Sequence, residues 1–261
     1  MAVSIADAIL LGLLQGFSEW LPVSSSGHLV IAQKLLGISA PAQFDIAIMA
    51  GTTLAIIAYY RKEIAAMAKG ALSLEKKSTG YLMLIAAAGI PTAIIGFWGK
   101  KIFEGLFEDA FAVSLLLAVT GVFLLAANYL HKKSGKKPLS LAAALIVGTA
   151  QGVAIAPGIS RSGATIGMAM ILGIEQAQAA QFSFFIGAPA MAVASAVEGF
   201  SAQAAGVGAA ELFAGCAAAF IAGYASIGFL LSILKKGRLD WFGYYCVFAG
   251  VVFALLTSGL V

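Results

Sequence analysis

Two short stretches of an otherwise apolar chain contain the side chains that could carry out chemistry. The first, from Gln15 to His28, holds an amide, a carboxylate, three consecutive serines and an imidazole. The second, from Pro157 to Thr165, holds two serines, a threonine and a guanidinium. A charged group at the centre of a membrane helix costs roughly 2.5–3.5 kcal/mol. The concentration of charged and polar side chains in these two stretches therefore predicts a functional site.

A hydroxyl nucleophile and an acid–base group occur together in the first stretch. Ser25 is the candidate nucleophile, and Ser24 and Ser26 are alternatives in the same run. His28 follows closely, and imidazole is the side chain that gains and loses a proton near neutral pH. This combination predicts phosphoryl transfer through a serine, or hydrolysis by an activated water.

Gln15 and Glu19 precede the serines and are four residues apart, so they share one face of a helix that we expect to end at Pro22. Glu19 could act as the base, orient His28, or hold a divalent cation. For the cation we expect Mg²⁺ or Ca²⁺, bound by Glu19, Gln15 and phosphate oxygens, because cations neutralise the charge that develops in diphosphate chemistry.

Both stretches contain the elements of an anion-binding site. Serines precede Gly27 and Gly163, where we expect short helices to begin, and the N–H groups at a helix N-terminus attract anions. Arg161 suits phosphate because its planar fork donates two parallel hydrogen bonds. The predicted substrate-binding residues are Ser24, Ser26, Ser160, Arg161, Ser162, Gly163 and Thr165.

The elements that position these residues are membrane helices. The chain has 261 residues, of which 61% are hydrophobic and 11% charged, whereas soluble domains carry about 25% charged residues. Apolar runs near the roughly 20 residues that span a bilayer predict six transmembrane helices. They lie at 43–60, 80–98, 111–130, 180–198, 209–232 and 241–260. The net charge of +4 comes from short clusters between these runs, so we expect no nucleic-acid partner.

Residues 5–38 and 141–174 are equally apolar at their ends but are interrupted by Pro, Ser and Gly. Irregular backbone at membrane depth is tolerated only where it is buried in protein or lines a wet cavity. We therefore expect two re-entrant helix–loop–helix hairpins that line the site. The predicted fold is an all-α integral membrane protein, a single membrane domain over residues 1–261.

The two hairpins also resemble each other. A shift of 136 residues aligns positions 12–38 with 148–174 and gives nine identities over 27 positions, including both Gln-Gly pairs and the Ser-x-Ser-Gly motifs. This predicts two repeats, 1–131 and 138–261, each a hairpin followed by three spans. An odd number of spans inverts the second copy, so the hairpin tips should meet near the middle of the membrane.

The basic residues predict the orientation. With both termini outside, the inside loops hold twelve of them: Arg61, Lys62, Lys69, Lys76, Lys77, Lys132, Lys133, Lys136, Lys137, Lys235, Lys236 and Arg238. The opposite side holds Lys100 and Lys101, with Lys34 as a third candidate. By the positive-inside rule, this is a multi-pass protein of the cytoplasmic (inner) membrane with both termini outside.

Two motifs carry a family resemblance. The stretch Gln-Gly-x-x-Glu-x-Leu-Pro-Val-Ser-Ser-Ser-Gly-His at 15–28, with Pro-Gly-x-Ser-Arg-Ser-Gly-Ala-Thr at 157–165, resembles the signatures of the undecaprenyl-diphosphate phosphatase family, also called the bacitracin-resistance protein family. The resemblance follows the full length of the chain in order and spacing. It implies hydrolysis of a C55-type polyprenyl diphosphate to the monophosphate, with Mg²⁺ or Ca²⁺, which recycles the lipid carrier for cell-envelope glycans.

The resemblance also implies roles for individual residues. In the family, the residues that match Glu19, Ser25, His28 and Arg161 are implicated in catalysis. The positions that match Ser160 and Thr165 contact phosphate. The implied partners are the polyprenyl diphosphate and the bilayer, with a homodimer as one option for the assembly.

One departure and one rival stay open. Many bacterial members carry Glu where this chain has Gln15, so either Glu19 suffices or the cation is held more weakly. The departure also leaves room for a relative that acts on another polyprenyl diphosphate, including an archaeal carrier. The rival is a carrier or flippase for a phosphorylated lipid or small anion, because inverted repeats that meet at the midplane also build transporters.

Overall fold

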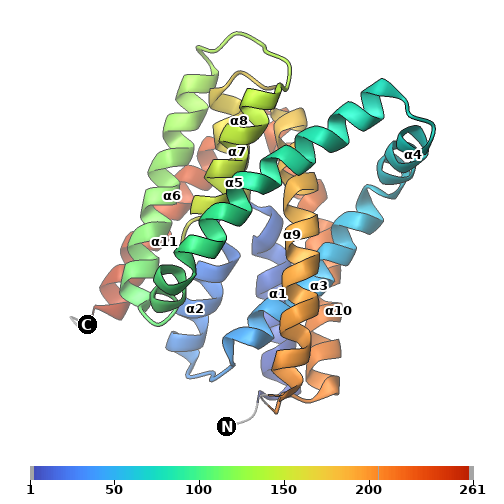
Figure 1. Cartoon of the computed structure of the whole chain (residues 1–261). Coiled ribbons are helices and arrows are strands. Elements are labelled where there is room, and N and C mark those ends of the chain that lie inside the picture. The colour runs from blue at the N-terminus through green and yellow to red at the C-terminus, as the bar shows by residue number, and fades with distance from the viewer. Residues whose placement is uncertain (1–2, 205, 259–261) are drawn as a thin grey trace.

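The computed structural model describes residues 3–204 and 206–258, and every regular element within them is an α-helix (Figure 1). The helices of the first half are α1 (Ile5–Trp20), α2 (Ser25–Leu36), α3 (Ala42–Tyr59), α4 (Arg61–Leu72), α5 (Lys76–Leu106) and α6 (Ala110–His131). Those of the second half are α7 (Leu141–Val153), α8 (Arg161–Ile171), α9 (Gln176–Ala204), α10 (Ala209–Lys235) and α11 (Asp240–Thr257). The all-α prediction is confirmed.

Among the described residues, five helices are long and apolar enough to cross a membrane, namely α5, α6, α9, α10 and α11. A sixth crossing is formed if α3 and α4, which meet at a bend of 74°, are counted as one broken span. Four of the six apolar runs predicted as spans lie wholly within α5, α6, α9 and α10. The run at 43–60 coincides with α3 as far as Tyr59 and the run at 241–260 with α11 as far as Thr257, and residues 259–260 lie outside the described part of the chain. The protein is therefore a multi-pass α-helical membrane protein.

α4 and α5 differ from the sequence prediction. Residues 61–72 were expected in a charged loop, but they form α4, whose alanine, leucine, lysine and methionine residues all favour helix. α5 has 31 residues, well beyond the run predicted at 80–98. Its length of about 46 Å exceeds the hydrocarbon thickness of about 30 Å. It accordingly runs obliquely across the bundle in Figure 1.

The two segments predicted to be broken are helix–loop–helix pairs, α1–α2 and α7–α8. Each of the four helices has 16 or fewer residues, too few for about 30 Å. Ser24 caps α2 by accepting a hydrogen bond from the N–H of Gly27, and Ser160 caps α8 by accepting one from Gly163. The serine caps expected from the sequence are therefore confirmed in both pairs.

The pairs are held in place by close helix contacts at glycines. α1 packs along α10, and α7 packs along α5. A Cβ at Gly12 would collide with the backbone of Gly215, and one at Gly148 with the backbone of Ala88. Gly12 and Gly148 are aligned by the 136-residue shift, and each makes its close contact with a helix of the opposite half of the chain. Two related repeats that pack against each other would give this pattern, and the limits of the repeats stay a prediction.

The long helices pack beside the paired ones. α6 packs along α11, and α3 packs along both α9 and α10. Figure 1 shows the two chain ends at the same end of the bundle and the α6–α7 connection at the opposite end. Residues of the two connecting loops, among them Leu21, Val23, Ala156 and Ser160, are buried.

Candidate active site

The last turn of α1 carries the carboxylate of the site. Glu19 is 5% exposed, and its Oε2 accepts a hydrogen bond of 2.7 Å from Nε2 of Gln15, one turn earlier. α1 ends at Trp20, and Pro22 prevents its continuation because proline lacks the N–H that the helix needs. The chain turns at this point, so the residues that follow α1 return toward its last turn.

The turn brings a serine back to the carboxylate. Ser24 has φ 65° and ψ 91°, a conformation that costs a non-glycine residue of order 1–3 kcal/mol. Directly after it, Ser25 begins α2 and its hydroxyl donates to Oε2 of Glu19 at 2.5 Å. The strained residue therefore lies next to the candidate nucleophile, which already has a hydrogen bond to a base.

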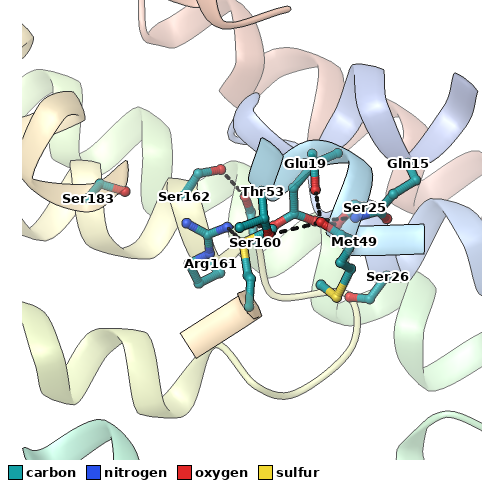
Figure 2. A network of polar contacts seen from close by, with 12 residues as sticks. Gln15, Glu19, Ser25, Ser26, Met49, Thr53, Ser160, Arg161, Ser162 and Ser183 are labelled. Carbon is teal, nitrogen blue, oxygen red and sulfur yellow. Dashed lines mark hydrogen bonds and ion pairs between the residues drawn. The ribbon is translucent and has the colours of Figure 1, made fainter. Parts of the chain in front are cut away.

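The second helix pair supplies the cation. Arg161 is the first residue of α8, and its Nη2 lies 2.5 Å from Oε1 of Glu19. Its guanidinium lies 5.0 Å from the ring centre of Trp20, an arrangement that adds cation–π attraction. Figure 2 shows Arg161, Glu19 and Ser25 converging from three different helices. Glu19 thus accepts from the nucleophile through one oxygen and pairs with the arginine through the other.

One nitrogen of the guanidinium is not used within the protein. Nη1 of Arg161 is buried and has no hydrogen-bond partner among the described residues. Gly187 of α9 lies so close that a Cβ there would overlap this nitrogen. A buried donor of a charged group without a partner is costly, so its presence indicates a position for an anion.

These groups line a cavity of about 380 Å³ between the two helix pairs, α3, α5 and α9. Of the predicted residues, Glu19, Ser24, Ser25, Ser26, Ser160 and Arg161 line it. The remaining walls are mostly apolar, with Thr92 and Gln151 as further polar members. The cavity offers an anion one cationic group and several hydroxyls within an apolar enclosure.

The other predicted substrate-binding residues hold the loop rather than line this cavity. Ser162 donates its hydroxyl to the carbonyl of Leu21 at 2.8 Å, which ties the α8 end to the α1 end. The N–H of Gly163 donates to the Ser160 cap. Thr165 is fully buried and bonds to the hydroxyl of Ser183 at 2.5 Å. Their contacts in this structure are those of positioning groups.

His28 is also held by neighbours other than Ser25. Its Nδ1 lies 2.8 Å from the carbonyl oxygen of Ser24, which can only accept, so Nδ1 carries a proton. Its Nε2 lies 2.7 Å from the hydroxyl of Tyr245 on α11, and the two rings stack at 5.7 Å. Among the hydrogen bonds of the described residues, none joins His28 to Ser25.

The predicted cation has a sparse set of ligands in the protein. The described residues contain no group of three or more His, Cys, Asp or Glu side chains placed to hold a metal ion. Glu19 offers one carboxylate, beside the amide of Gln15 and the hydroxyl of Ser25. Mg²⁺ is commonly held by one or two carboxylates with the remaining ligands from phosphate and water. The site therefore fits a cation only if the substrate supplies most of the ligands.

Four contributors to the site carried no signal in the sequence. Gly187, Met191 and Tyr245 lie in apolar runs, and Trp20 is an apolar residue within the first polar stretch, so all four read as ordinary membrane residues. The sulfur of Met191 lies 2.7 Å from Nη2 of Arg161, and Tyr245 is 217 residues from His28. Gln151 could have been found, because it matches Gln15 in the repeat.

Fold and site together define a class: a multi-pass α-helical membrane protein with a buried serine, carboxylate and arginine in one cavity. Comparison with protein families agrees with this description. Residues 8–252 match the model of the family described as bacitracin resistance protein BacA. The chain belongs to this family.

Curated relatives match over nearly the whole chain. An undecaprenyl-diphosphatase of Carboxydothermus hydrogenoformans is 40% identical and covers 97% of both chains. Proteins of the same name from Korarchaeum cryptofilum and Methanosphaera stadtmanae are 37% and 36% identical. These cover 95% and 98% of this chain and 98% and 99% of the relatives. The resemblance to the bacitracin-resistance family is confirmed.

Proposed function

We propose that this protein is a membrane phosphatase that hydrolyses undecaprenyl (polyprenyl) diphosphate to the monophosphate and inorganic phosphate. In this role it recycles the lipid carrier for cell-envelope glycan synthesis. The names of the relatives support this substrate. The observation that carries the proposal is the hydrogen bond of 2.5 Å from Ser25 to Glu19, because it places a nucleophile on a base beside a free guanidinium nitrogen.

We assign binding of the diphosphate to the donors of the residues that line the cavity. Nη1 of Arg161 donates to the terminal phosphate, and the N-termini of α2 and α8 add the positive ends of their dipoles. The apolar walls exclude water, which strengthens each of these attractions. A divalent cation held by Glu19, Gln15 and the phosphates would neutralise further charge on the diphosphate.

The chemical step then proceeds in two stages. Glu19 Oε2 accepts the hydroxyl proton of Ser25 while Oγ bonds to the terminal phosphorus. The bond from that phosphorus to the bridging oxygen breaks, and prenyl monophosphate leaves with the proton. Water next attacks the seryl phosphate and gives its proton to Glu19, the bond from phosphorus to Oγ breaks, and Glu19 returns this proton to Oγ. The serine hydroxyl and inorganic phosphate are the products, so the enzyme is restored.

His28 has a different part in this scheme from the proton transfer predicted from the sequence. Both of its hydrogen bonds are directed to Ser24 and Tyr245, and Ser24 is the strained residue before the nucleophile. We infer that His28 is a positioning residue that holds this peptide, with Tyr245 holding the ring. Proton transfer is left to Glu19.

A carrier or flippase is not favoured over the phosphatase. Transport of a phosphorylated lipid needs an anion site, which Arg161 provides. It does not need a serine hydroxyl held on a carboxylate, which is what Ser25 and Glu19 form.

The proposed location is the cytoplasmic membrane, with both termini outside. Support comes from the basic clusters, which belong to α4, the start of α5, the α6–α7 connection and the α10–α11 connection. Labelling of single cysteines at Ser39 and Lys136 by an impermeant thiol reagent, in a chain with Cys216 and Cys246 replaced by alanine, tests it. Ser39→Cys should react in intact cells, and Lys136→Cys only after permeabilisation. Light scattering of the purified protein tests the homodimer that was one option for the assembly.

The decisive experiment is phosphate release from polyprenyl diphosphate by the detergent-purified protein with Mg²⁺. We expect Ser25→Ala and Arg161→Ala each to lower the rate at least 100-fold, equivalent to about 2.7 kcal/mol in the barrier. Ser232→Ala and Arg238→Ala, which change exposed residues outside the cavity, are the matched controls. A folded wild type that releases no phosphate with any cation would remove the phosphatase proposal in favour of the carrier.

A further inference from the structure

A second cavity of about 420 Å³ lies between α6, α7 and α8. Four residues of α7 line it along two turns, from Ile146 to Val153, a length of about 10 Å. The full lining is Val119, Thr120, Phe123, Ile146, Thr149, Ala150, Val153, Ile159, Ser160, Ala164 and Met168. Nothing in the proposed chemistry uses this space.

The polar atoms of the lining are already satisfied within the protein. Thr149 donates its hydroxyl to the carbonyl of Leu145, and Thr120 donates to the carbonyl of Gly158. The Ser160 hydroxyl accepts from the N–H of Gly163 and contacts the Ser162 hydroxyl. The surface that the cavity presents to a ligand is consequently apolar, so the ligand must be apolar too.

One end of this cavity adjoins the candidate active site. Ile159 and Ser160 line both cavities, and Ser160 caps the helix that carries Arg161. The other side opens toward the bilayer, since Val119, Ile146 and Val153 are 56%, 43% and 47% exposed on helices of a membrane protein. The cavity therefore lies between the loop that carries Ser160 and Arg161 and the surrounding lipid.

The internal repeat shows how this space arises. Ala164 is matched by His28 under the 136-residue shift. In the first half, the imidazole fills the space beside α2 and bonds to Tyr245 of α11. In the second half, the methyl group of Ala164 leaves the corresponding space open toward Phe123 of α6. The substitution turns a filled helix contact in one half into a cavity in the other.

We propose that this cavity binds the isoprene units that follow the first one in the polyprenyl diphosphate, and this rests on the phosphatase function proposed above. With the diphosphate at Arg161, the tail passes Ile159 and lies along α7, and the rest of the chain continues into lipid. Lipid is as apolar as the cavity, so the gain is not hydrophobic burial. The gain is orientation: a tail fixed in one direction keeps the terminal phosphorus near Ser25.

Filling the cavity tests this placement. Ala150→Phe puts a ring into the cavity, and Ala142→Phe puts the same ring on the exposed face of α7 outside it. We expect Ala150→Phe to lower kcat/KM at least tenfold for undecaprenyl and farnesyl diphosphates and less than twofold for dimethylallyl diphosphate, whose short chain does not reach α7. Ala142→Phe should change neither more than twofold. Equal losses for all three substrates, or no loss for any, would overturn the proposal.

Photo-crosslinking locates the tail without catalysis. The probe is a farnesyl methylenediphosphonate with a diazirine on its second isoprene unit, bound to the wild type and mapped by mass spectrometry. Labels on Phe123 or Ile146 are expected, whereas labels on Ala190 or Ala194, at the α9 side of the active-site cavity, would refute the assignment. If the wild type released no phosphate from any substrate, the phosphatase function would fail, while the crosslinks would still report where the tail lies.

Discussion

Arg161 and Glu19 form an ion pair in which Nη2 of the guanidinium lies 2.5 Å from Oε1 of the carboxylate. It joins α8 to α1 across 142 residues of sequence, with side chains that are 15% and 4% exposed. The pair is thus the charged link between the two helix–loop–helix pairs. It also sets the geometry in which Glu19 receives the proton of Ser25.

Removal of one partner leaves the other charge in an apolar site, which typically costs about 3–5 kcal/mol. We therefore expect Glu19→Gln to lower the free energy of unfolding by about that amount, as measured by denaturation in detergent. Replacing both residues with glutamine should recover part of the loss. Asp240→Asn, which breaks the more exposed pair with Arg238, should cost less than about 1 kcal/mol. A Glu19→Gln protein as stable as the wild type would show that the pair is not formed.

Gly187→Ala should act on substrate binding through Arg161. The new Cβ would overlap Nη1, and the flexible guanidinium would give way rather than the backbone of α9. We expect KM for the diphosphate to rise about tenfold, since a charge-assisted hydrogen bond is worth about 1.5–3 kcal/mol and part of it is lost. Gly89→Ala is the matched control, because its Cβ would have no neighbour within 4 Å. An unchanged KM in Gly187→Ala would mean that Nη1 does not contact substrate.

Tyr245→Phe tests the positioning role of His28. The change removes the hydrogen bond to Nε2 but keeps the stacked ring, so kcat should fall about fivefold, equivalent to about 1 kcal/mol, at constant KM. Tyr244→Phe, at an exposed neighbour, is the control. His28→Asn should keep the pH profile of kcat unchanged, because a positioning group adds no ionisation to the reaction. A lost limb in that profile, with a fall as deep as that of Ser25→Ala, would make His28 the acid or base.

Gln15→Glu tests the cation ligands. Nε2 of Gln15 lies 2.7 Å from Oε2 of Glu19, so a carboxylate at position 15 would give the cation two charged ligands in place of one. We expect the Mg²⁺ concentration for half-maximal phosphate release to fall at least fivefold. Gln178→Glu, on α9 outside the cavity, should leave it unchanged. If Gln15→Glu did not alter the Mg²⁺ dependence, this face of α1 would not bind the metal.

Much of the fold follows from local patterns in the sequence. The six apolar runs predict spans by composition, and Pro22 predicts the end of the first short helix. The caps at Ser24 and Ser160 follow from side chains that compete for backbone N–H groups. α4 was missed because charge was taken as a sign of a loop, although its residues favour helix. These successes and the failure all concern contacts within one helix.

The sequence predicted which polar residues form the site, but it did not predict the residues that contact them. Glu19, Ser25 and Arg161 stand out because charged and hydroxyl groups are unusual in apolar segments, and the structure brings these three together. Their partners do not stand out, since Gly187 and Tyr245 are common membrane residues whose importance comes from distant contacts. The same is true of the contact between His28 and Tyr245, since the sequence named only Glu19 as a group that could orient His28.

The packing of α1 along α10 has a consequence for biosynthesis. α1 is made before α8, which carries Arg161, and long before α10, which begins at Ala209. Before Arg161 is synthesised, Glu19 lacks its ion-pair partner. Before α10 is synthesised, α1 lacks the helix along which it packs, so α1 cannot reach its final position until most of the chain has been made. Such non-local contacts make assembly slow and leave a partly made chain exposed to misfolding. Truncated chains that lack α10 should therefore fail to fold correctly in the membrane and should be degraded by membrane proteases.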